Sequence, residues 1–237
     1  VCAAQKSADR HADKGYERGR MVVIPNGYDL SRYAPDSAAR VRVRAQWGLP
    51  EDAPVIGCVA RWDPLKDHAN LLRAVAALVR DGRDAGLRCV LIGRGMDADN
   101  AELGALIDKL GLRDRLVLAG PSDDVPAAMN GLDLHVLSSC AEGFPNVVAE
   151  AMACGACCVV TDVGDTAYIV GDTGVVVPPE QSEALARGIE TALREVASRG
   201  RARAGEAGRA RVLELFDLKR MVQAYIAVWR RISGVQA

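Results

Sequence analysis

Short apolar runs alternate with longer helical patterns along this 237-residue chain, and that alternation constrains its fold more than any other feature. The apolar runs predict strands over residues 55–60, 87–92, 116–118, 132–137, 157–161 and 174–177. Between them, apolar residues recur at helical spacing, as over 71–79. Strands that alternate with helices pair in parallel through right-handed crossovers, and these strands are apolar on both faces. We therefore predict an α/β fold, a Rossmann-like, doubly wound parallel sheet covered by helices on each side.

Charge and hydropathy argue against two classes of protein. Thirty basic and 31 acidic side chains give a net charge of −1, so no nucleic-acid partner is expected. The longest apolar run, Ala151–Val160, is about half as long as a bilayer-spanning helix. Most of the seven cysteines lie in apolar runs, which is typical of reduced thiols in a cytoplasmic protein; Cys154 and Cys157 have C-x-x-C spacing but no second ligand pair. The chain begins at Val1 rather than methionine, which suggests a part of a longer protein.

Two cations follow the first predicted strand. In a doubly wound sheet, ligands bind at the carboxyl ends of the strands, so the loops there are the candidate functional segments. Arg61 and Lys66 leave the strand five residues apart and could together hold a diphosphate, the guanidinium as a fork and the ammonium as a point charge. Pairing of these cations with Asp63 and Asp67 is an equally good interpretation.

The second loop contains Gly93 and Gly95 as a G-x-G directly after a strand. A third glycine is absent, because Ala98 stands at that position, so the dinucleotide-binding fingerprint is incomplete. The small residues would nevertheless let a base or a ribose approach the backbone closely.

Two carboxylates flank a predicted helix start in the loop after the fourth strand. Glu142 lies before Pro145, which suits the first turn of a helix, and Glu150 lies eight residues after Glu142. The free N–H groups of such a turn bind anions. A carboxylate can accept bonds from two neighbouring hydroxyls, so this arrangement suits a nucleotide-sugar, with the diphosphate at the helix end and a sugar at each glutamate. The alternative is one surface glutamate and one that caps the helix.

Together with the segments 23–29, 160–165 and 171–174, the motifs named above resemble the carboxyl-terminal domain of the retaining GT-B glycosyltransferases of the group 1 family, also called family 4. The likeness covers about residues 21–177. It is carried by the segment 23–29, Arg61 with Lys66, Glu142 with Glu150 as an E-x7-E signature, and the closing loops 160–165 and 171–174. The chain would then be one half of a GT-B fold.

The resemblance implies a role for each matched residue. Arg61 and Lys66 would bind the diphosphate of the donor, Glu142 would act as the catalytic residue at the donor sugar, and Glu150 would bind the ribose. The backbone that lines the phosphate and the sugar would be that of Gly143, Phe144, Pro145, Asn146 and Val147. Gly93 and Gly95 would border the nucleobase. Asp165 stands where many members have a glycine.

The resemblance also implies partners and domain limits. The donor would be a UDP- or GDP-sugar, with no metal and no cofactor, and the acceptor a glycan or a lipid-linked sugar, as in polysaccharide biosynthesis. Residues 1–20 would be a linker and the end of a missing amino-terminal GT-B domain, 21–200 the nucleotide-sugar-binding domain, and 201–237 trailing helices that pack back toward the missing domain. The resemblance leaves open a peripheral membrane association of the full-length enzyme.

Two other functions fit parts of the sequence. One is an NAD(P)-type oxidoreductase domain, against which the missing third glycine counts. The other is a nucleotide-binding module without transferase chemistry. The basic stretch 194–220, with eight Lys or Arg and four Asp or Glu, predicts a solvated helical face rather than a membrane or partner patch.

Overall fold

The computed structural model describes residues 1–83 and 86–233 and contains one six-stranded sheet in the order β3-β2-β1-β4-β5-β6. Every described strand pair is parallel, which confirms the predicted Rossmann-like architecture. The strands are β1 Val55–Val59, β2 Arg88–Ile92, β3 Leu116–Gly120, β4 Leu134–Leu137, β5 Cys157–Thr161 and β6 Val175–Val177.

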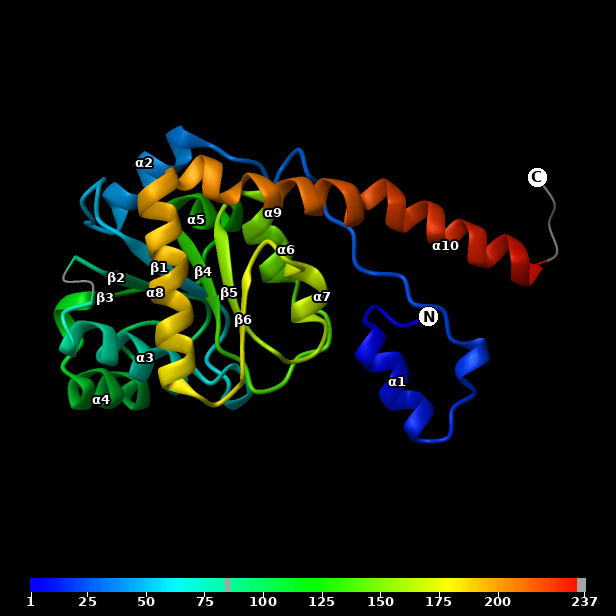
Figure 1. The fold of residues 1–237 in the computed structure, drawn as a ribbon, viewed down its shortest axis with the longest axis horizontal. Helices are drawn as coiled ribbons and strands as arrows, with labels where there is room; N and C mark the ends of the chain where they lie inside the picture. The colour runs from blue at the N-terminus through cyan, green and yellow to red at the C-terminus, as the bar shows by residue number, and fades with distance from the viewer. Residues whose placement is uncertain (84–85, 234–237) are drawn as a thin grey trace.

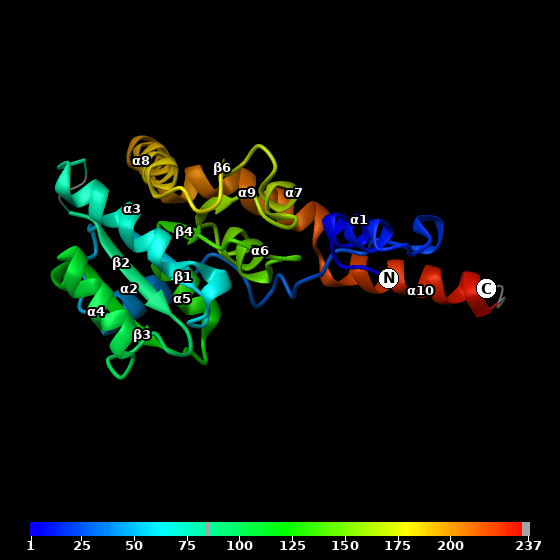
Figure 2. The ribbon, with the colours of Figure 1, turned by 90° about the horizontal axis from the view of Figure 1, so that it is seen from below.

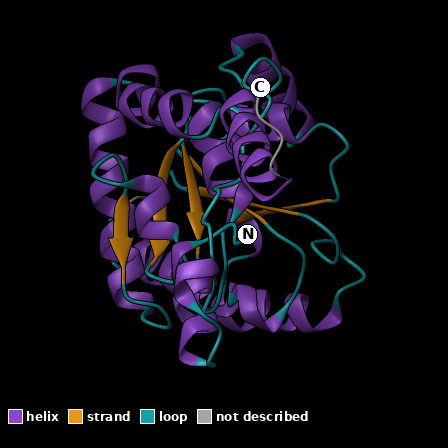
Figure 3. Ribbon diagram, turned by 90° about the vertical axis from the view of Figure 1, so that its right-hand side faces the viewer, coloured by secondary structure: helices purple, strands orange, loops and turns teal. Residues whose placement is uncertain are grey.

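Helices cover both faces of the sheet (Figures 1 and 3). The helices are α1 Gln5–Asp13, α2 Ser37–Gln46, α3 His68–Arg80, α4 Ala101–Leu110, α5 Val125–Gly131, α6 Asn146–Ala153, α7 Thr166–Val170, α8 Ser182–Arg199, α9 Arg201–Leu215 and α10 Leu218–Ser233. One core lies between the sheet and α3, α4 and α8, and the other between the sheet and α5, α6 and α9. Strand β1 serves both, because Ile56 and Cys58 face the first core and Val55 and Val59 the second.

Helix α2 is an element that the sequence pattern did not predict. Asp36 caps its amino end by accepting a bond from the Ala39 N–H at 2.9 Å. Its buried face includes Arg44, only 1% exposed, whose guanidinium bonds to Asp133 Oδ2 at 2.8 Å. Asp133 also accepts bonds from Arg40 at 2.5 Å and from the Val55 N–H at 2.8 Å. This buried ion cluster therefore joins α2 to the start of β1.

The prediction of a solvated basic face over 194–220 is wrong for three arginines of α9, which reach inward to backbone carbonyls. Arg201 donates to Leu132 O at 2.7 Å, and burial lowers its pKa to about 10. Arg209 and Arg211 donate to carbonyls near the ends of α6 and α7. Carbonyls at helix ends have no partner within the helix, so these arginines bind α9 to the domain. Arg203, Lys219 and Arg220 are exposed, as predicted.

Helices α1 and α10 extend from the same side of the sheet domain (Figures 1 and 2). No described residue of α10 is buried, and Trp229 is 63% exposed. The described part of the chain holds no helix with the length and apolarity needed to cross a bilayer.

Two buried histidines predict a loss of stability in acid. His135 on β4 is fully buried and His68 at the start of α3 is 2% exposed; no described group bonds to their ring nitrogens. Desolvation lowers each pKa from 6.5 to about 4. The unfolded chain therefore binds more protons below pH 6.5, and the free energy of unfolding should fall by up to about 3 kcal/mol per histidine between pH 6.5 and pH 4.

The measurement is urea unfolding of the wild type and His135→Leu between pH 7 and pH 4.5. Leucine fills a similar volume and does not titrate, so the variant should show a clearly shallower loss of stability as the pH falls. An identical pH dependence in the two proteins would contradict this assignment.

Candidate functional site

The loop after β1 turns back over the loop after β4 at the carboxyl edge of the sheet. Residues Pro64–Lys66 form a single 3-10 turn, which the Asp63 carboxylate caps by accepting from the Leu65 N–H. The two loops are joined where Ser138 Oγ donates to Lys66 O at 2.9 Å and where Cys140 N donates to Leu65 O at 2.9 Å. These contacts fix the direction in which Lys66 leaves the turn.

Lys66 and Glu142 form the central pair of the site. Their Nζ and Oε1 atoms are 2.6 Å apart, and the Ser139 hydroxyl donates to the same carboxylate oxygen at 2.7 Å. The side chains of Lys66 and Glu142 are 21% and 10% exposed, so the pair is screened less by water than a surface ion pair. The structure thus brings together two of the residues that the sequence singled out.

Arg61 is not part of that pair. Its guanidinium contacts Asp63 at 2.8 Å, and its side chain is 60% exposed. The sequence left open whether Arg61 and Lys66 pair with Asp63 and Asp67. For Arg61 the structure shows such a pair, whereas Lys66 pairs with Glu142 and not with Asp67. Asp67 instead caps α3 by accepting from the Asn70 N–H. The pairing of Lys66 with Asp67 is therefore wrong.

Helix α6 begins beside this pair, at Asn146. Pro145 is the residue before the helix rather than part of its first turn, a shift of one position from the prediction. Pro145 provides no side-chain cap, and the Val148 N–H donates to Pro145 O at 3.2 Å, so among the first-turn N–H groups those of Asn146 and Val147 are available to an anion. The Asn146 side chain accepts bonds from Asn26 at 2.8 Å and from the Tyr28 hydroxyl at 2.9 Å, and Phe144 packs edge-on against Phe216. These contacts fix the side chains of Phe144 and Asn146 at the start of the helix.

Close packing explains both glycines of the second loop. Gly93 has a φ of +140°, and a Cβ there would lie 2.1 Å from the carbonyl oxygen of Ala60. Gly95 has a φ of +77°, and a Cβ there would lie 2.9 Å from Cβ of Trp62. The loops after β1 and β2 are therefore in direct contact, and contact of Gly93 and Gly95 with a nucleobase stays a prediction.

Glu150 lies on α6, half-buried beside Tyr33. Desolvation raises its pKa, and a hydrogen bond with the Tyr33 hydroxyl opposes that rise. Tyr33 was not identified from the sequence, because a single tyrosine in an irregular segment gives no pattern. The assignment of Glu150 to a ribose stays a prediction.

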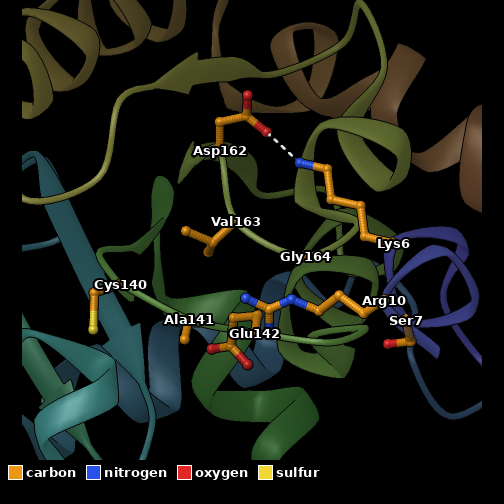
Figure 4. Close-up of a pocket in the computed structure, with 9 residues that line it drawn as sticks. All are labelled: Lys6, Ser7, Arg10, Cys140, Ala141, Glu142, Asp162, Val163 and Gly164. Carbon is orange, nitrogen blue, oxygen red and sulfur yellow. Dashed lines mark hydrogen bonds and ion pairs between the residues drawn. The ribbon is translucent and has the colours of Figure 1, made fainter. Parts of the chain in front are cut away.

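A cavity of about 260 Å³ opens beside Glu142 (Figure 4). Three segments line it, contributing Lys6, Ser7 and Arg10 from α1, Cys140, Ala141 and Glu142 from the loop after β4, and Asp162, Val163 and Gly164 from the loop after β5. Glu142 is the only predicted site residue in this lining. The contribution of α1 was not predicted, because its residues lie more than a hundred positions away in the sequence. Across the described residues, no cluster of three or more His, Cys, Asp or Glu could hold a metal ion.

Comparison with known proteins establishes the family. The family described as Glycosyl transferases group 1 matches residues 53–195, which is more than half of the chain. The chain belongs to this family, and its sheet is the Rossmann-like unit of GT-B glycosyltransferase structures.

Curated relatives are glycosyltransferases of about twice this length. The putative glycosyltransferase EpsF of Bacillus subtilis is 30% identical over 200 residues, which are 84% of this chain and 51% of that protein. The D-inositol 3-phosphate glycosyltransferase of Nocardia farcinica is 34% identical over 75% of this chain and 39% of that protein. The chain therefore spans about half the length, or less, of these relatives.

Solved structures agree with the fold. HepE of Anabaena in complex with UDP has a TM-score of 0.86 and 26% identity, with 99% of this chain and 63% of that chain covered. The carboxyl-terminal domain of a group 1 glycosyl transferase from Francisella tularensis has a TM-score of 0.62 and 22% identity, with 81% of this chain and all of that chain covered. The second likeness shows the fold alone.

Proposed function

We propose that this chain is the donor-binding half of a metal-independent, retaining GT-B glycosyltransferase of family 4. The donor is a UDP- or GDP-sugar, and the acceptor is a glycan or a lipid-linked sugar, in cytoplasmic polysaccharide biosynthesis. The Lys66–Glu142 pair next to the uncapped first turn of α6 carries this proposal. The likeness to HepE, a protein solved with UDP, supports it.

The pair suits a ligand that carries both a diphosphate and a sugar. A diphosphate at the first turn of α6 would meet free N–H groups and the positive end of the helix dipole. Lys66 would then contact the phosphate as well as Glu142, since an ammonium group has three donors. Glu142 would keep its bond from Ser139, which fixes the carboxylate, and would accept bonds from the hydroxyls of the sugar.

Arg61 and Glu150 complete the proposal at the two ends of the ligand. Arg61 is exposed and bonded only to Asp63 among the described residues, so its guanidinium can exchange that partner for a phosphate at little cost. Glu150 would bind the ribose together with Tyr33. Transfer would also need an acceptor-binding domain that precedes this one, because the relatives are about twice as long.

In the proposed complex, Lys66, Arg61 and the helix end would supply the positive charge that a divalent cation supplies in a metal-dependent transferase. We therefore expect the chain to bind a nucleoside diphosphate sugar in the presence of excess EDTA. The measurement is a calorimetric and thermal-shift screen against UDP-glucose, GDP-mannose and ADP-glucose, with and without EDTA, and with NADH and NADPH as comparisons.

One nucleotide-sugar should raise the melting temperature and give a saturable heat, equal within error in EDTA. Binding that disappears in EDTA would contradict the metal-independent assignment. Binding of NADH or NADPH alone would instead support the oxidoreductase alternative.

A further inference from the structure

The amino end of α1 is capped by a residue far away in the sequence. Ala4 precedes the helix and cannot cap it with a side chain. The Asp165 carboxylate, 160 residues from Gln5, accepts from the Gln5 N–H at 2.6 Å and from the Lys6 N–H at 3.0 Å. Asp165 is only 3% exposed, so these charge-assisted bonds are shielded from water.

Asp165 gives its carboxylate to α1 rather than to the helix that it precedes. It stands directly before α7, yet makes no side-chain bond to the described residues of that helix. Its own N–H donates to Gly143 O at 2.9 Å, in the loop that contains Glu142. One residue therefore joins the loop after β4, the start of α7 and the first turn of α1.

That attachment places α1 against the cavity beside Glu142. Lys6 extends to Asp162, with 2.9 Å between the charged atoms, and Arg10 extends toward the side of the cavity where Glu142 lies (Figure 4). Ser7 and Arg10 line the same cavity, and the Arg10 side chain makes no hydrogen bond or ion pair with any described residue. The Ser7 hydroxyl and the Arg10 guanidinium can donate hydrogen bonds to the hydroxyls of a sugar, and the Glu142 carboxylate in the same lining can accept bonds from those hydroxyls.

We propose that Asp165 is a positioning residue that fastens α1 to the sugar end of the donor site, so that Ser7 and Arg10 complete the wall that contacts the transferred sugar. The inference rests on the proposed function for the identity of the ligand. The attachment itself is a property of the free protein. The loss of Asp165 should therefore affect an intact nucleotide-sugar and leave the nucleoside diphosphate, which lies at Lys66, unaffected.

Variants on the two sides of the contact distinguish the attachment of α1 from damage to the loop that contains Asp165. Asp165→Ala removes both acceptors. Gln5→Pro removes one donor from the α1 side and leaves the donor loop untouched, since proline is tolerated at the first position of a helix and Ala4 is already extended. Asp165→Asn keeps one acceptor and should rescue part of the effect. Asp13→Ala, at the exposed carboxyl end of α1 and outside the cavity, is the matched control.

The experiment measures amide hydrogen exchange over residues 4–10 in the free chain, and calorimetric affinity for UDP and for UDP-glucose. In Asp165→Ala, exchange at Lys6 should be about tenfold faster or more, and UDP-glucose affinity should fall about tenfold, with UDP affinity within about twofold of wild type. Gln5→Pro and Asp165→Asn should lie between wild type and Asp165→Ala, and Asp13→Ala should match wild type.

Unchanged exchange at Lys6 in Asp165→Ala would overturn the attachment, whatever the nucleotide results. Equal losses for UDP and UDP-glucose would overturn the role at the sugar. If the wild type bound neither ligand while the exchange result held, the proposed function would fail and α1 would remain fastened by Asp165 without a role in sugar binding.

Discussion

Asp133→Ala is expected to lower the free energy of unfolding by about 3–5 kcal/mol, because it leaves the buried guanidinium of Arg44 and the partly buried one of Arg40 without their carboxylate. Asp133 accepts from Arg40, from Arg44 and from the Val55 N–H, and Arg44 is 1% exposed. Arg44 keeps bonds to the carbonyls of Gly131, Glu51 and Ala53, but these do not neutralise its charge. Urea unfolding at pH 7 measures the loss.

The matched control is Asp108→Ala, which removes a surface ion pair between Asp108 on α4 and Arg113, just after that helix. The two side chains are 53% and 74% exposed, so the expected change is at most about 1 kcal/mol. A loss of similar size in the two variants would show that the cluster at Asp133 contributes no more than a surface pair.

Lys66→Ala is expected to lower the affinity for UDP by about a hundredfold. The variant removes an ammonium from the proposed diphosphate site. It also leaves Glu142, which is 10% exposed and 2.6 Å from Lys66 Nζ, as an unpaired carboxylate facing an incoming anion. Calorimetric titration with UDP measures the effect, and Lys109→Ala, on the exposed surface of α4, should bind UDP as the wild type does.

A second variant distinguishes the two parts of that loss. In the Lys66→Ala, Glu142→Gln double variant the uncompensated charge is gone, so UDP should bind about tenfold more tightly than in Lys66→Ala. If Lys66→Ala bound UDP with wild-type affinity, the diphosphate would lie elsewhere. If the double variant showed no recovery, Glu142 would lie too far from the diphosphate to repel it.

The sheet was predictable because buried parallel strands are continuous apolar runs. The prediction for β5, 157–161, coincides with the observed strand. Helix α2 was missed because its buried face depends on Arg44, and an arginine in the sequence Arg-Val-Arg-Val-Arg resembles surface charge. Helix α7, with five residues, is shorter than two turns and cannot show a helical period.

The site was predictable only where the strand ends bring its residues together. Lys66 and Glu142 follow β1 and β4, which are neighbours in the sheet, so their meeting follows from the strand order. The contact of Arg61 with Asp63 was one of the two interpretations of that loop. The contribution of α1 to the cavity could not be predicted, because Gln5 and Asp165 are 160 residues apart and no local sequence pattern links them. The inward arginines of α9 were missed for the same reason.

The most direct test of the account is an NMR titration of the isotopically labelled 237-residue chain with UDP in EDTA. The central claim is that the diphosphate binds between Lys66 and the first turn of α6. The account predicts saturable shifts that are largest at the backbone amides of 143–147 and 61–67, and that are lost in Lys66→Ala. Shifts confined to surfaces remote from this edge of the sheet, or the absence of any saturable shift, would contradict it.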